Sequence, residues 1–362
     1  MRGATKLTIG MVAVFAMVLA ACGEDVVDEP PAEDEPTETE EVVEDELDDG
    51  EPEEAVDVEE RTLRFAYITP ETFPYQDGAE RFKELVEERS GGAITVELFP
   101  GAELGGERDI NEGILEGSIH IGIGAGALAA LAPIQNLTQL PFIVANQDHM
   151  HAIIESEAGD EIASRIEDAG FKVLDFFSTG DSALQTTDQA IETPDDLSGV
   201  RIRAIENQAI VDALEALGAN PTPMPYPEIY TGLQQGVIEG AHLDWGSVAS
   251  LRVYELIDYS TGPDVAFLAE PRPVIMSMEF WESLDAQTQE IIQDAMTEAA
   301  EYERQVFLDV IDDAIATVEE AGVTFTDIDA DAFIEIVEPV WQEWAEELDA
   351  VELLEMINDL RP

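Results

Sequence analysis

Predicted strands and helices alternate along the first half of the chain. Residues 62–68 (TLRFAYI) alternate between apolar and polar side chains, as a strand does, and end in a Thr-Pro turn. Residues 74–92 carry apolar side chains at helical spacing and stop at a Gly-Gly pair. The next predicted strand, helix and strand are 93–100, 106–118 and 119–126. Strand–helix units in series predict an α/β fold, with a mainly parallel sheet covered by helices.

The second half repeats this alternation and then becomes helical. The strands and helices predicted here are 170–180, 200–204, 207–219 and 237–245, with a proline-rich stretch at 220–236. Residues 279–322 form a helical pattern without proline or internal glycine. This pattern predicts either one spine helix that crosses both halves or two helices that meet near Leu284 and Asp285. A last helical segment is predicted at 330–360.

The chain is strongly acidic, with 81 Asp and Glu residues against 16 Lys and Arg and a formal charge of −65. Nucleic acid is excluded as a partner because its phosphates require a basic surface. The acidic stretch 23–60 does not explain this charge. Without residues 1–60, 60 acidic and 14 basic residues remain, a formal charge of −46. The composition therefore predicts a halophilic protein that stays soluble in high salt, where the charges are screened.

The first 22 residues have the pattern of an export signal. Arg2 and Lys6 precede a mostly apolar run at 7–21, which is too short to span a bilayer comfortably. The run ends in the sequence LAAC, which resembles a bacterial lipobox, so Cys22 is predicted to be lipidated and to become the mature N-terminus. An ordinary signal peptide with an incidental cysteine is the alternative. Cys22 is the only cysteine, so no intrachain disulfide is expected.

Residues 23–60 are polyacidic and contain several prolines. Repulsion between like charges and a low apolar content predict a disordered, extended segment. Behind a lipid anchor, such a segment would act as a tether. We therefore expect an extracytoplasmic protein that is anchored to the cell membrane through its lipid.

A glycine-rich loop follows the strand predicted at 119–126. Gly122, Gly124 and Ala127 fit the dinucleotide-binding fingerprint G-x-G-x-x-[GA]. However, this loop is the third in the series, and no acidic residue ends a strand about 20 residues later, as that fingerprint requires. Small residues that allow close approach of a ligand or of other backbone are the favoured interpretation. A nucleotide-dependent enzyme is kept as an alternative.

Patterns of metal binding and catalysis are absent from the sequence. His149 and His151 flank Met150 without a third ligand nearby, and they are predicted to lie on the surface at the start of a helix. Residues 180–185 (GDSALQ) lack the closing glycine of the nucleophile motif G-x-S-x-G. The protein is therefore expected to use no cofactor and to have no enzymatic activity.

Arg203 is the strongest candidate for a binding residue. If 200–204 is a strand, Arg201 and Arg203 project to one side and Ile202 packs on the other. Arg203 lies nearer the carboxyl end of the strand, where open α/β sheets bind ligands. Its guanidinium group can hold a carboxylate through two parallel hydrogen bonds. An ion pair with one of the many acidic side chains explains the spacing equally well.

Five segments of the chain match a known family in order, at 96–122, 140–144, 194–204, 217–241 and 253–263. In these segments the chain resembles the DctP-like solute-binding proteins of tripartite ATP-independent periplasmic (TRAP) transporters. The resemblance extends from about 62 to 345. It implies a two-lobed, type II-like periplasmic-binding-protein fold that closes on a small organic acid. It also implies delivery of that acid to the membrane subunits of a TRAP permease.

The resemblance also implies binding residues. Arg203 matches the family arginine that pairs with the substrate carboxylate, Tyr226 the aromatic residue that packs on the ligand, and Glu206 a frequent polar contact. The first lobe is expected to contribute the loop from Ile68 through Glu71 to Phe73 and the backbone at Ala125 and Gly126.

Two positions depart from the family pattern. Leu184 replaces a second arginine of many members, and Leu243 replaces their usual asparagine. The loss of a cation and an amide favours a ligand with one carboxylate and a more apolar body. Asp244 or Trp245 are candidates to compensate, Asp244 for a cationic group and Trp245 for a flat face.

The lobes are expected to be discontinuous because the chain crosses between them more than once. Lobe I is predicted to comprise 61–181 with 269–308, and lobe II to comprise 182–268 with 309–362. The expected function is that of a monomeric solute-binding lipoprotein that captures a small monocarboxylate for a TRAP permease. A ligand sensor for a membrane signalling kinase, which would use the same closure, is the alternative.

Overall fold

The computed structural model describes residues 58–362, which contain two sheets. The first sheet has the strand order β2-β1-β3-β10-β4. Its strands are β1 (Arg61–Ala66), β2 (Ile94–Phe99), β3 (Ile121–Ile123), β4 (Phe171–Ser178) and β10 (Pro271–Ser277). β1 pairs in parallel with β2 and β3, whereas β10 runs antiparallel to both of its neighbours. The predicted mainly parallel sheet is thus present, with one reversed strand that the sequence did not indicate.

The second sheet has the order β11-β9-β5-β8-β6-β7. Its strands are β5 (Ser182–Thr186), β6 (Arg201–Ala204), β7 (Asn220–Pro223), β8 (Gly240–Asp244), β9 (Tyr259–Thr261) and β11 (Thr324–Thr326). β6 is parallel to both β7 and β8, and β5 is antiparallel to β8. Both sheets belong to one two-lobed α/β fold, as predicted.

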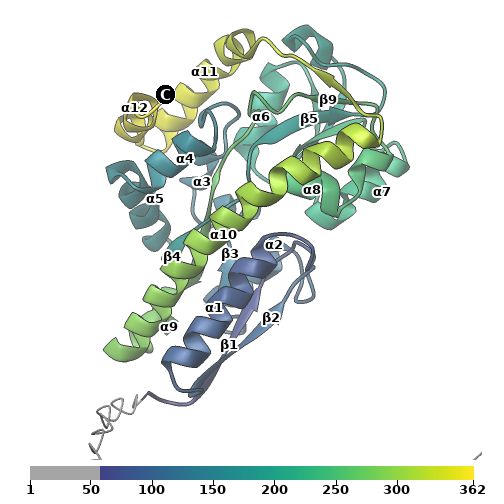
Figure 1. Cartoon of the computed structure of the whole chain (residues 1–362). Coiled ribbons are helices and arrows are strands. Elements are labelled where there is room, and N and C mark those ends of the chain that lie inside the picture. Colours follow the sequence, from purple (N-terminus) through teal and green to yellow (C-terminus); the bar gives the residue numbers. More distant parts are fainter. Residues whose placement is uncertain (1–57) are drawn as a thin grey trace, which may run out of the picture. The chain divides into compact units, whose positions relative to one another are not determined.

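Helices cover both sheets (Figure 1). Those before β5 are α1 (Tyr75–Arg89), α2 (Glu107–Leu115), α3 (Gln135–Thr138), α4 (Gln147–Ile154) and α5 (Glu157–Glu167), with the 3-10 helix η1 (Gly126–Ala130). Those between β5 and β10 are α6 (Gln208–Ala216), α7 (Ile229–Gln234) and α8 (Trp245–Ser250), with η2 (Pro194–Leu197), η3 (Tyr226–Glu228) and η4 (Val253–Glu255). The last four helices are α9 (Met278–Ser283), α10 (Ala286–Glu320), α11 (Ala330–Glu347) and α12 (Val351–Asp359).

Helix α10 connects the two halves of the fold. Both predictions for this region are partly right, because the helical pattern breaks at Leu284 and then continues as one helix of 35 residues. The side chain of Asp285 caps the new helix by accepting a hydrogen bond from the Thr288 N–H. α10 packs on α1 and β4 beside the first sheet and on α8 beside the second (Figure 1).

The chain crosses from the first sheet to the second directly after β4. Ser178 ends β4 and Ser182 begins β5, and Gly180 between them has a φ of 70°. A Cβ atom on Gly180 would lie 2.2 Å from the Phe307 ring, so only glycine fits this turn. The chain returns after β9 and crosses a third time along α10.

The position of His149 differs from the predicted surface position. Its helix begins after Asn146, as predicted, but the His149 side chain is 1 % exposed and does not lie on the surface. Its Nδ1 atom accepts a hydrogen bond from the Ala145 N–H at 3.1 Å, and Nε2 lies 2.8 Å from the Ile357 carbonyl oxygen. The imidazole therefore joins α4 to α12 and packs in the core.

The last two helices contact elements of both halves. α11 packs on α6 and α3, and α12 packs on α5. Among residues 58–362, no helix has the length and apolar content needed to cross a membrane. The predictions for the signal at 1–22, for Cys22 and for nearly all of the tether at 23–60 concern residues outside the described range.

Candidate ligand-binding site

A cavity of about 630 Å³, including its open mouth, lies between the two halves. Loops from the first sheet, both crossover segments and the ends of β6 and β8 contribute side chains to it. The lining residues are Tyr67, Ile68, Thr69, Phe73, Tyr75, Glu107, Ile123, Ala125, Thr179, Ser182, Arg203, Ile205, Tyr226, His242, Leu243, Asp244, Ser247, Leu268, Glu270 and Arg272. Its mixed apolar and polar lining is typical of a small-molecule site.

Arg203 enters the cavity from β6 and is 5 % exposed. Its Nε atom donates a hydrogen bond to the Met224 carbonyl oxygen at 3.0 Å, which orients the guanidinium group. Among the described residues, no carboxylate oxygen lies within 4.0 Å of this group. Burial lowers the pKa of Arg203 to about 10, so the side chain is still cationic at neutral pH. In contrast, Arg201 is exposed and pairs with Glu239 at 3.0 Å.

Glu107 is the carboxylate that acts most strongly on Arg203 and raises its pKa against the effect of burial. It begins α2, and its Oε2 atom accepts a hydrogen bond from the Ala127 N–H at 3.0 Å. That N–H belongs to the glycine-rich loop, which thus positions an acidic side chain instead of a nucleotide phosphate. The close backbone approach expected for this loop is present at Gly124, where a Cβ atom would lie 2.6 Å from Leu128 Cδ2.

A second arginine, Arg272, reaches the cavity from β10. It forms an ion pair with Glu270, whose side chain is 2 % exposed. Burial opposes the charge of both groups. The pKa of Glu270 is raised because burial outweighs the attraction of Arg272, whereas several nearby acids keep the pKa of Arg272 above its usual value despite burial. The expectation that the site had lost a cation at Leu184 therefore needs correction, because Arg272 supplies one from another strand.

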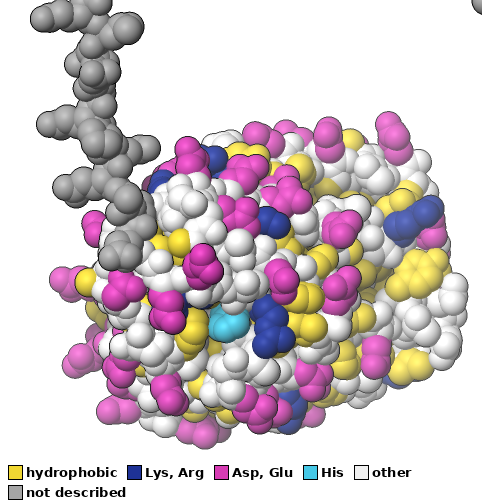
Figure 2. All heavy atoms as spheres, turned by 90° about the horizontal axis from the view of Figure 1, so that it is seen from below, with side chains coloured by type: hydrophobic (Ala, Val, Ile, Leu, Met, Phe, Trp, Pro, Cys, Tyr) yellow, Lys and Arg dark blue, Asp and Glu magenta, His cyan; other side chains and the backbone are white. Residues whose placement is uncertain are grey.

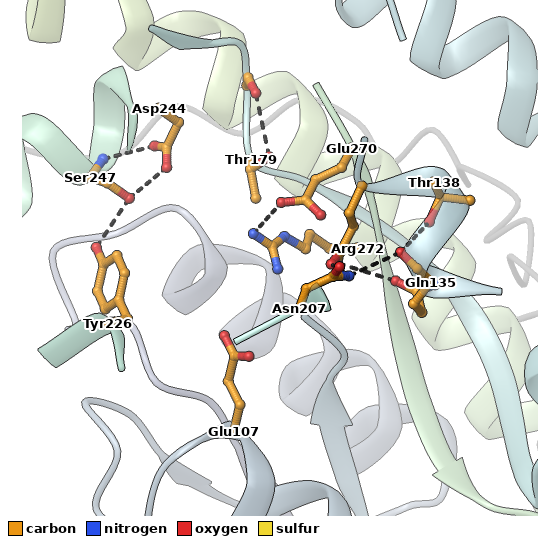
Figure 3. Close-up of polar contacts among 12 residues, drawn as sticks. Glu107, Gln135, Thr138, Thr179, Asn207, Tyr226, Asp244, Ser247, Glu270 and Arg272 are labelled. Carbon is orange, nitrogen blue, oxygen red and sulfur yellow. Dashed lines mark hydrogen bonds and ion pairs between the residues drawn. The ribbon is translucent and has the colours of Figure 1, made fainter. Parts of the chain in front are cut away.

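Asp244, Ser247 and Tyr226 form a hydrogen-bonded chain on one side of the cavity (Figure 3). The Tyr226 hydroxyl lies 3.1 Å from Ser247 Oγ, which donates to Asp244 Oδ2 at 2.5 Å. The Ser247 N–H donates to Asp244 Oδ1 at 2.7 Å. Burial raises the pKa of Asp244 to about 6 despite these hydrogen bonds. Figure 3 shows the Glu270–Arg272 pair between this chain and the Gln135–Asn207 contact, with the Glu107 carboxylate pointing towards it from below.

Several buried polar atoms of the lining have no hydrogen-bond partner within the described residues. They are Thr69 Oγ1, Tyr75 Oη, His242 Nε2, Glu270 Oε2, and Nε and Nη1 of Arg272. Burial, with Arg203 and Arg272 nearby, lowers the pKa of His242 to about 3, so this imidazole is neutral. Buried donors and acceptors are normally paired. Their concentration around one cavity indicates a place for a polar ligand.

The two halves touch each other beside the cavity. The Asn207 Nδ2 atom donates to Gln139 Oε1 at 2.9 Å, and this contact joins the start of α6 to the segment after α3. The backbone of Gly126 lies against Ile205, so that a Cβ atom on Gly126 would be 1.6 Å from Ile205 Cγ2. The two halves are therefore in direct contact beside the cavity.

Seven of the predicted site residues line this cavity: Arg203, Tyr226, Leu243, Asp244, Ile68, Phe73 and Ala125. Glu206 and Glu71 are exposed outside it, and Gly126 contacts Ile205 beside it. Leu184 is fully buried in the core. Trp245 packs edge-to-face on Phe325, with ring centroids 5.5 Å apart, and does not offer a flat face to the cavity.

The sequence did not predict four residues that line the cavity, Arg272, Glu270, Glu107 and His242. The sequence did contain a signal for Arg272 and Glu270. The segment AEPRPVI (269–275) places this pair of opposite charges among prolines, directly before an apolar run. Glu107 offered no signal, since acidic residues at helix starts are frequent and this chain is rich in them. Cys22 lies outside the described residues. No group of three or more metal-ligating side chains occurs within residues 58–362.

Two α/β halves around a cavity, with a buried guanidinium group that has no carboxylate within 4.0 Å in residues 58–362, define a solute-binding protein of the periplasmic type. Comparison with known proteins gives the same class. Residues 65–347 match the model of the bacterial extracellular solute-binding proteins, family 7, so the chain belongs to this DctP family. Its members are the solute-binding components of TRAP transporters, and the resemblance found in the sequence is thereby confirmed.

Individual relatives cover most of the chain. The 2,3-diketo-L-gulonate-binding periplasmic protein YiaO of Escherichia coli is 30 % identical over 275 residues, which are 75 % of this chain and 83 % of that protein. The TRAP solute-binding protein of Roseobacter denitrificans with bound β-D-glucuronate has a TM-score of 0.78 and 28 % identity, covering 82 % of this chain and 99 % of that one. The protein of Sulfitobacter sp. NAS-14.1 with bound β-D-galacturonate has a TM-score of 0.79 and 26 % identity, covering 83 % and 100 %.

Proposed function

We propose that this protein captures a small organic acid with a single carboxylate and delivers it to the membrane subunits of a TRAP permease. The observation that carries the proposal is Arg203, a buried cation that lines the cavity and has no carboxylate partner within 4.0 Å in the described part of the chain. The ligands named for the three relatives are all organic acids with one carboxylate.

In the proposed mechanism, the acid enters between the open halves and its carboxylate pairs with Arg203. Met224 already holds Nε, so the two terminal nitrogens can bind both carboxylate oxygens. Closure then removes water from the pair and strengthens it. A ligand that binds the closed form more tightly than the open form drives the closure by that difference in affinity.

Arg203→Ala tests this proposal, and Arg201→Ala is its matched control on the same strand. In a thermal-shift screen of organic acids, a true ligand at 100 times its dissociation constant should stabilise the wild-type protein by about 2.7 kcal/mol. The shift should disappear in Arg203→Ala and persist in Arg201→Ala, whose side chain is exposed. A full shift in Arg203→Ala would remove this residue from the site and refute the proposal.

The predicted lobes are part of the same proposal. Lobe I would be 61–181 with 269–308, and lobe II would be 182–268 with 309–362. Sheet membership supports this division, since each sheet draws its strands from one of the two sets. The packing of α12 on α5 adds a contact between them.

We also propose that the protein is a monomer anchored to the outer face of the cell membrane through Cys22 and adapted to high salt. Figure 2 shows acidic side chains scattered over the face drawn, with few basic ones between them. Added salt should raise the melting temperature by screening their repulsion. A melting temperature that is independent of salt would contradict the adaptation to high salt. Mass spectrometry of the mature N-terminus would test whether Cys22 carries a lipid.

A further inference from the structure

The cavity is lined by more acidic than basic side chains. Its lining includes two guanidinium groups, Arg203 and Arg272, and three carboxyl groups, Glu107, Glu270 and Asp244. Glu270 is paired with Arg272, and Glu107 is the acid that acts most strongly on Arg203. Asp244 is the third acid, and no cationic group of the described residues lies within 4.0 Å of it.

This excess disfavours a ligand that carries only a negative charge. With all three acids ionised and His242 neutral, the lining has a formal charge of −1 before any ligand enters. A plain carboxylate would raise this to −2 inside a closed cavity, where like charges repel strongly. A ligand that brings its own positive charge avoids the repulsion and still supplies a carboxylate to Arg203.

The cavity also contains hydrogen-bond acceptors that could bind a cationic group of the ligand. Glu270 Oε2 is buried, lines the cavity and accepts no hydrogen bond within the described residues. Thr69 Oγ1 and Tyr75 Oη are unpartnered in the same way and offer further oxygens. The negative charge of Asp244 also acts on Glu270, so a cation between these two acids would relieve their repulsion.

The separation of the two ends suits a short molecule. Arg203 on β6 is opposite Ala241 on β8, and Asp244 is three residues further along β8. At ~3.3 Å per residue, this places the two backbone positions about 10 Å apart along the strand.

From these observations we infer that the ligand is a zwitterion, whose carboxylate binds Arg203 and whose cationic nitrogen lies between Glu270 and Asp244. This inference rests on the proposed function, because it keeps Arg203 as the carboxylate site. It narrows the ligand class from small organic acids with a single carboxylate to amino acids or related zwitterions.

The inference is tested with pairs of compounds that differ only in an amino or hydroxyl group. Suitable pairs are D-glucosaminate and D-gluconate, L-serine and L-glycerate, and γ-aminobutyrate and γ-hydroxybutyrate. Isothermal titration of the wild-type protein should show that the amino member of at least one pair binds at least about tenfold more tightly than its hydroxy partner. Equal or tighter binding of the hydroxy acids would overturn the inference.

Asp244→Asn provides a second measurement that does not depend on the choice of pairs. Asparagine keeps the cap of α8 but removes the third negative charge. The variant should lose the preference for the amino compound and bind D-glucuronate at least about tenfold more tightly than the wild type. Asp264→Asn is the control, because it makes the same change of net charge at an exposed position. If no pair binds the wild type, an unchanged affinity of Asp244→Asn for D-glucuronate overturns the inference.

The two proposals fail in different ways. Tight binding of D-glucuronate to the wild-type protein, abolished by Arg203→Ala, would leave the proposed function intact and refute the zwitterion. Proton uptake during that binding, measured in two buffers of different ionisation enthalpy, would show that an acid of the cavity is neutralised instead. Ligand binding that does not depend on Arg203 would refute both proposals.

Discussion

A methyl group on Gly126 would lie 1.6 Å from the Cγ2 atom of Ile205. This contact joins the glycine-rich loop after β3, beside the first sheet, to the end of β6 in the second sheet. A larger side chain at position 126 would therefore require Ile205 or the loop to move, and we expect it to hold the halves further apart.

Gly126→Ala should hinder closure and weaken ligand binding without unfolding either half. The apparent dissociation constant rises as the fraction of closing-competent protein falls, and we expect a rise of at least about tenfold. Isothermal titration with a ligand from the screen measures it. Reducing Ile205 as well, in Gly126→Ala/Ile205→Val, should restore part of the affinity. Unchanged binding in the single variant would show that closure does not require this contact.

Gly180 should be sensitive to substitution because it combines a left-handed backbone with a tight contact. Gly180→Ala places a methyl group 2.2 Å from the Phe307 ring at a φ of 70°. We expect the free energy of unfolding to fall by about 3 kcal/mol, from backbone strain and overpacking together. Gly199→Ala is the control, since Gly199 has a φ of 78° and open space around it, and should cost about 1 kcal/mol. Equal losses in the two variants would contradict the role of Phe307.

Glu303 should make stability depend on pH. Burial raises its pKa to about 8, although the Ser178 N–H donates to it at 2.9 Å. The folded protein therefore keeps a proton that the unfolded chain releases above its ordinary pKa of 4.5. The contribution of this carboxyl to stability is full below that value, falls as pH rises and is lost above about 8.

Glu303→Gln should remove this dependence. We compare the free energy of unfolding of Glu303→Gln with that of the wild type at each pH. The difference in favour of the variant should increase from about pH 5 to about pH 9, by at most about 4 kcal/mol. Urea titrations across this range measure it. Glu301→Gln, at an exposed position of the same helix, should show a gain that is independent of pH. If the free energy of unfolding depends on pH in the same way in Glu303→Gln and in the wild type, Glu303 is not the source of the pH dependence.

The ion pair of Arg272 and Glu270 should matter for folding as well as for binding. Arg272→Met leaves the Glu270 carboxylate buried without its cation, which should cost about 3 kcal/mol in the ligand-free protein. Adding Glu270→Gln should recover most of this loss because it removes the stranded charge. Chemical denaturation without ligand measures both variants. Arg272→Met with wild-type stability but poor binding would indicate that the arginine serves the ligand alone.

Local patterns predicted the fold well where they were strong. The strand–helix alternation and the break at Leu284 in the long helical pattern both appear in the structure. β10 was missed because Pro271 and Pro273 interrupt its apolar run, and prolines argue against a strand inside a sheet. His149 was assigned to the surface because a helix start gives no information about α12, which packs on it from more than 200 residues away.

In the candidate site, too, local patterns indicated some residues and gave no signal for others. Arg203 could be proposed as a candidate from one strand, since its place at the carboxyl end of β6 is a local property, and the family resemblance then favoured binding over an ion pair. Arg272 could not, because it reaches the cavity from a strand that runs against its neighbours and joins the first sheet late in the chain. Loss of an arginine at one sequence position therefore did not imply loss of positive charge in the cavity.

Helix α10 restricts how the cavity can open. Its 35 residues extend about 52 Å at 1.5 Å per residue and pack beside both sheets. A continuous rod of this kind resists stretching, so the halves cannot separate along its axis. We therefore expect the cavity to open by a rotation of the halves that widens most at the edge farthest from the helix.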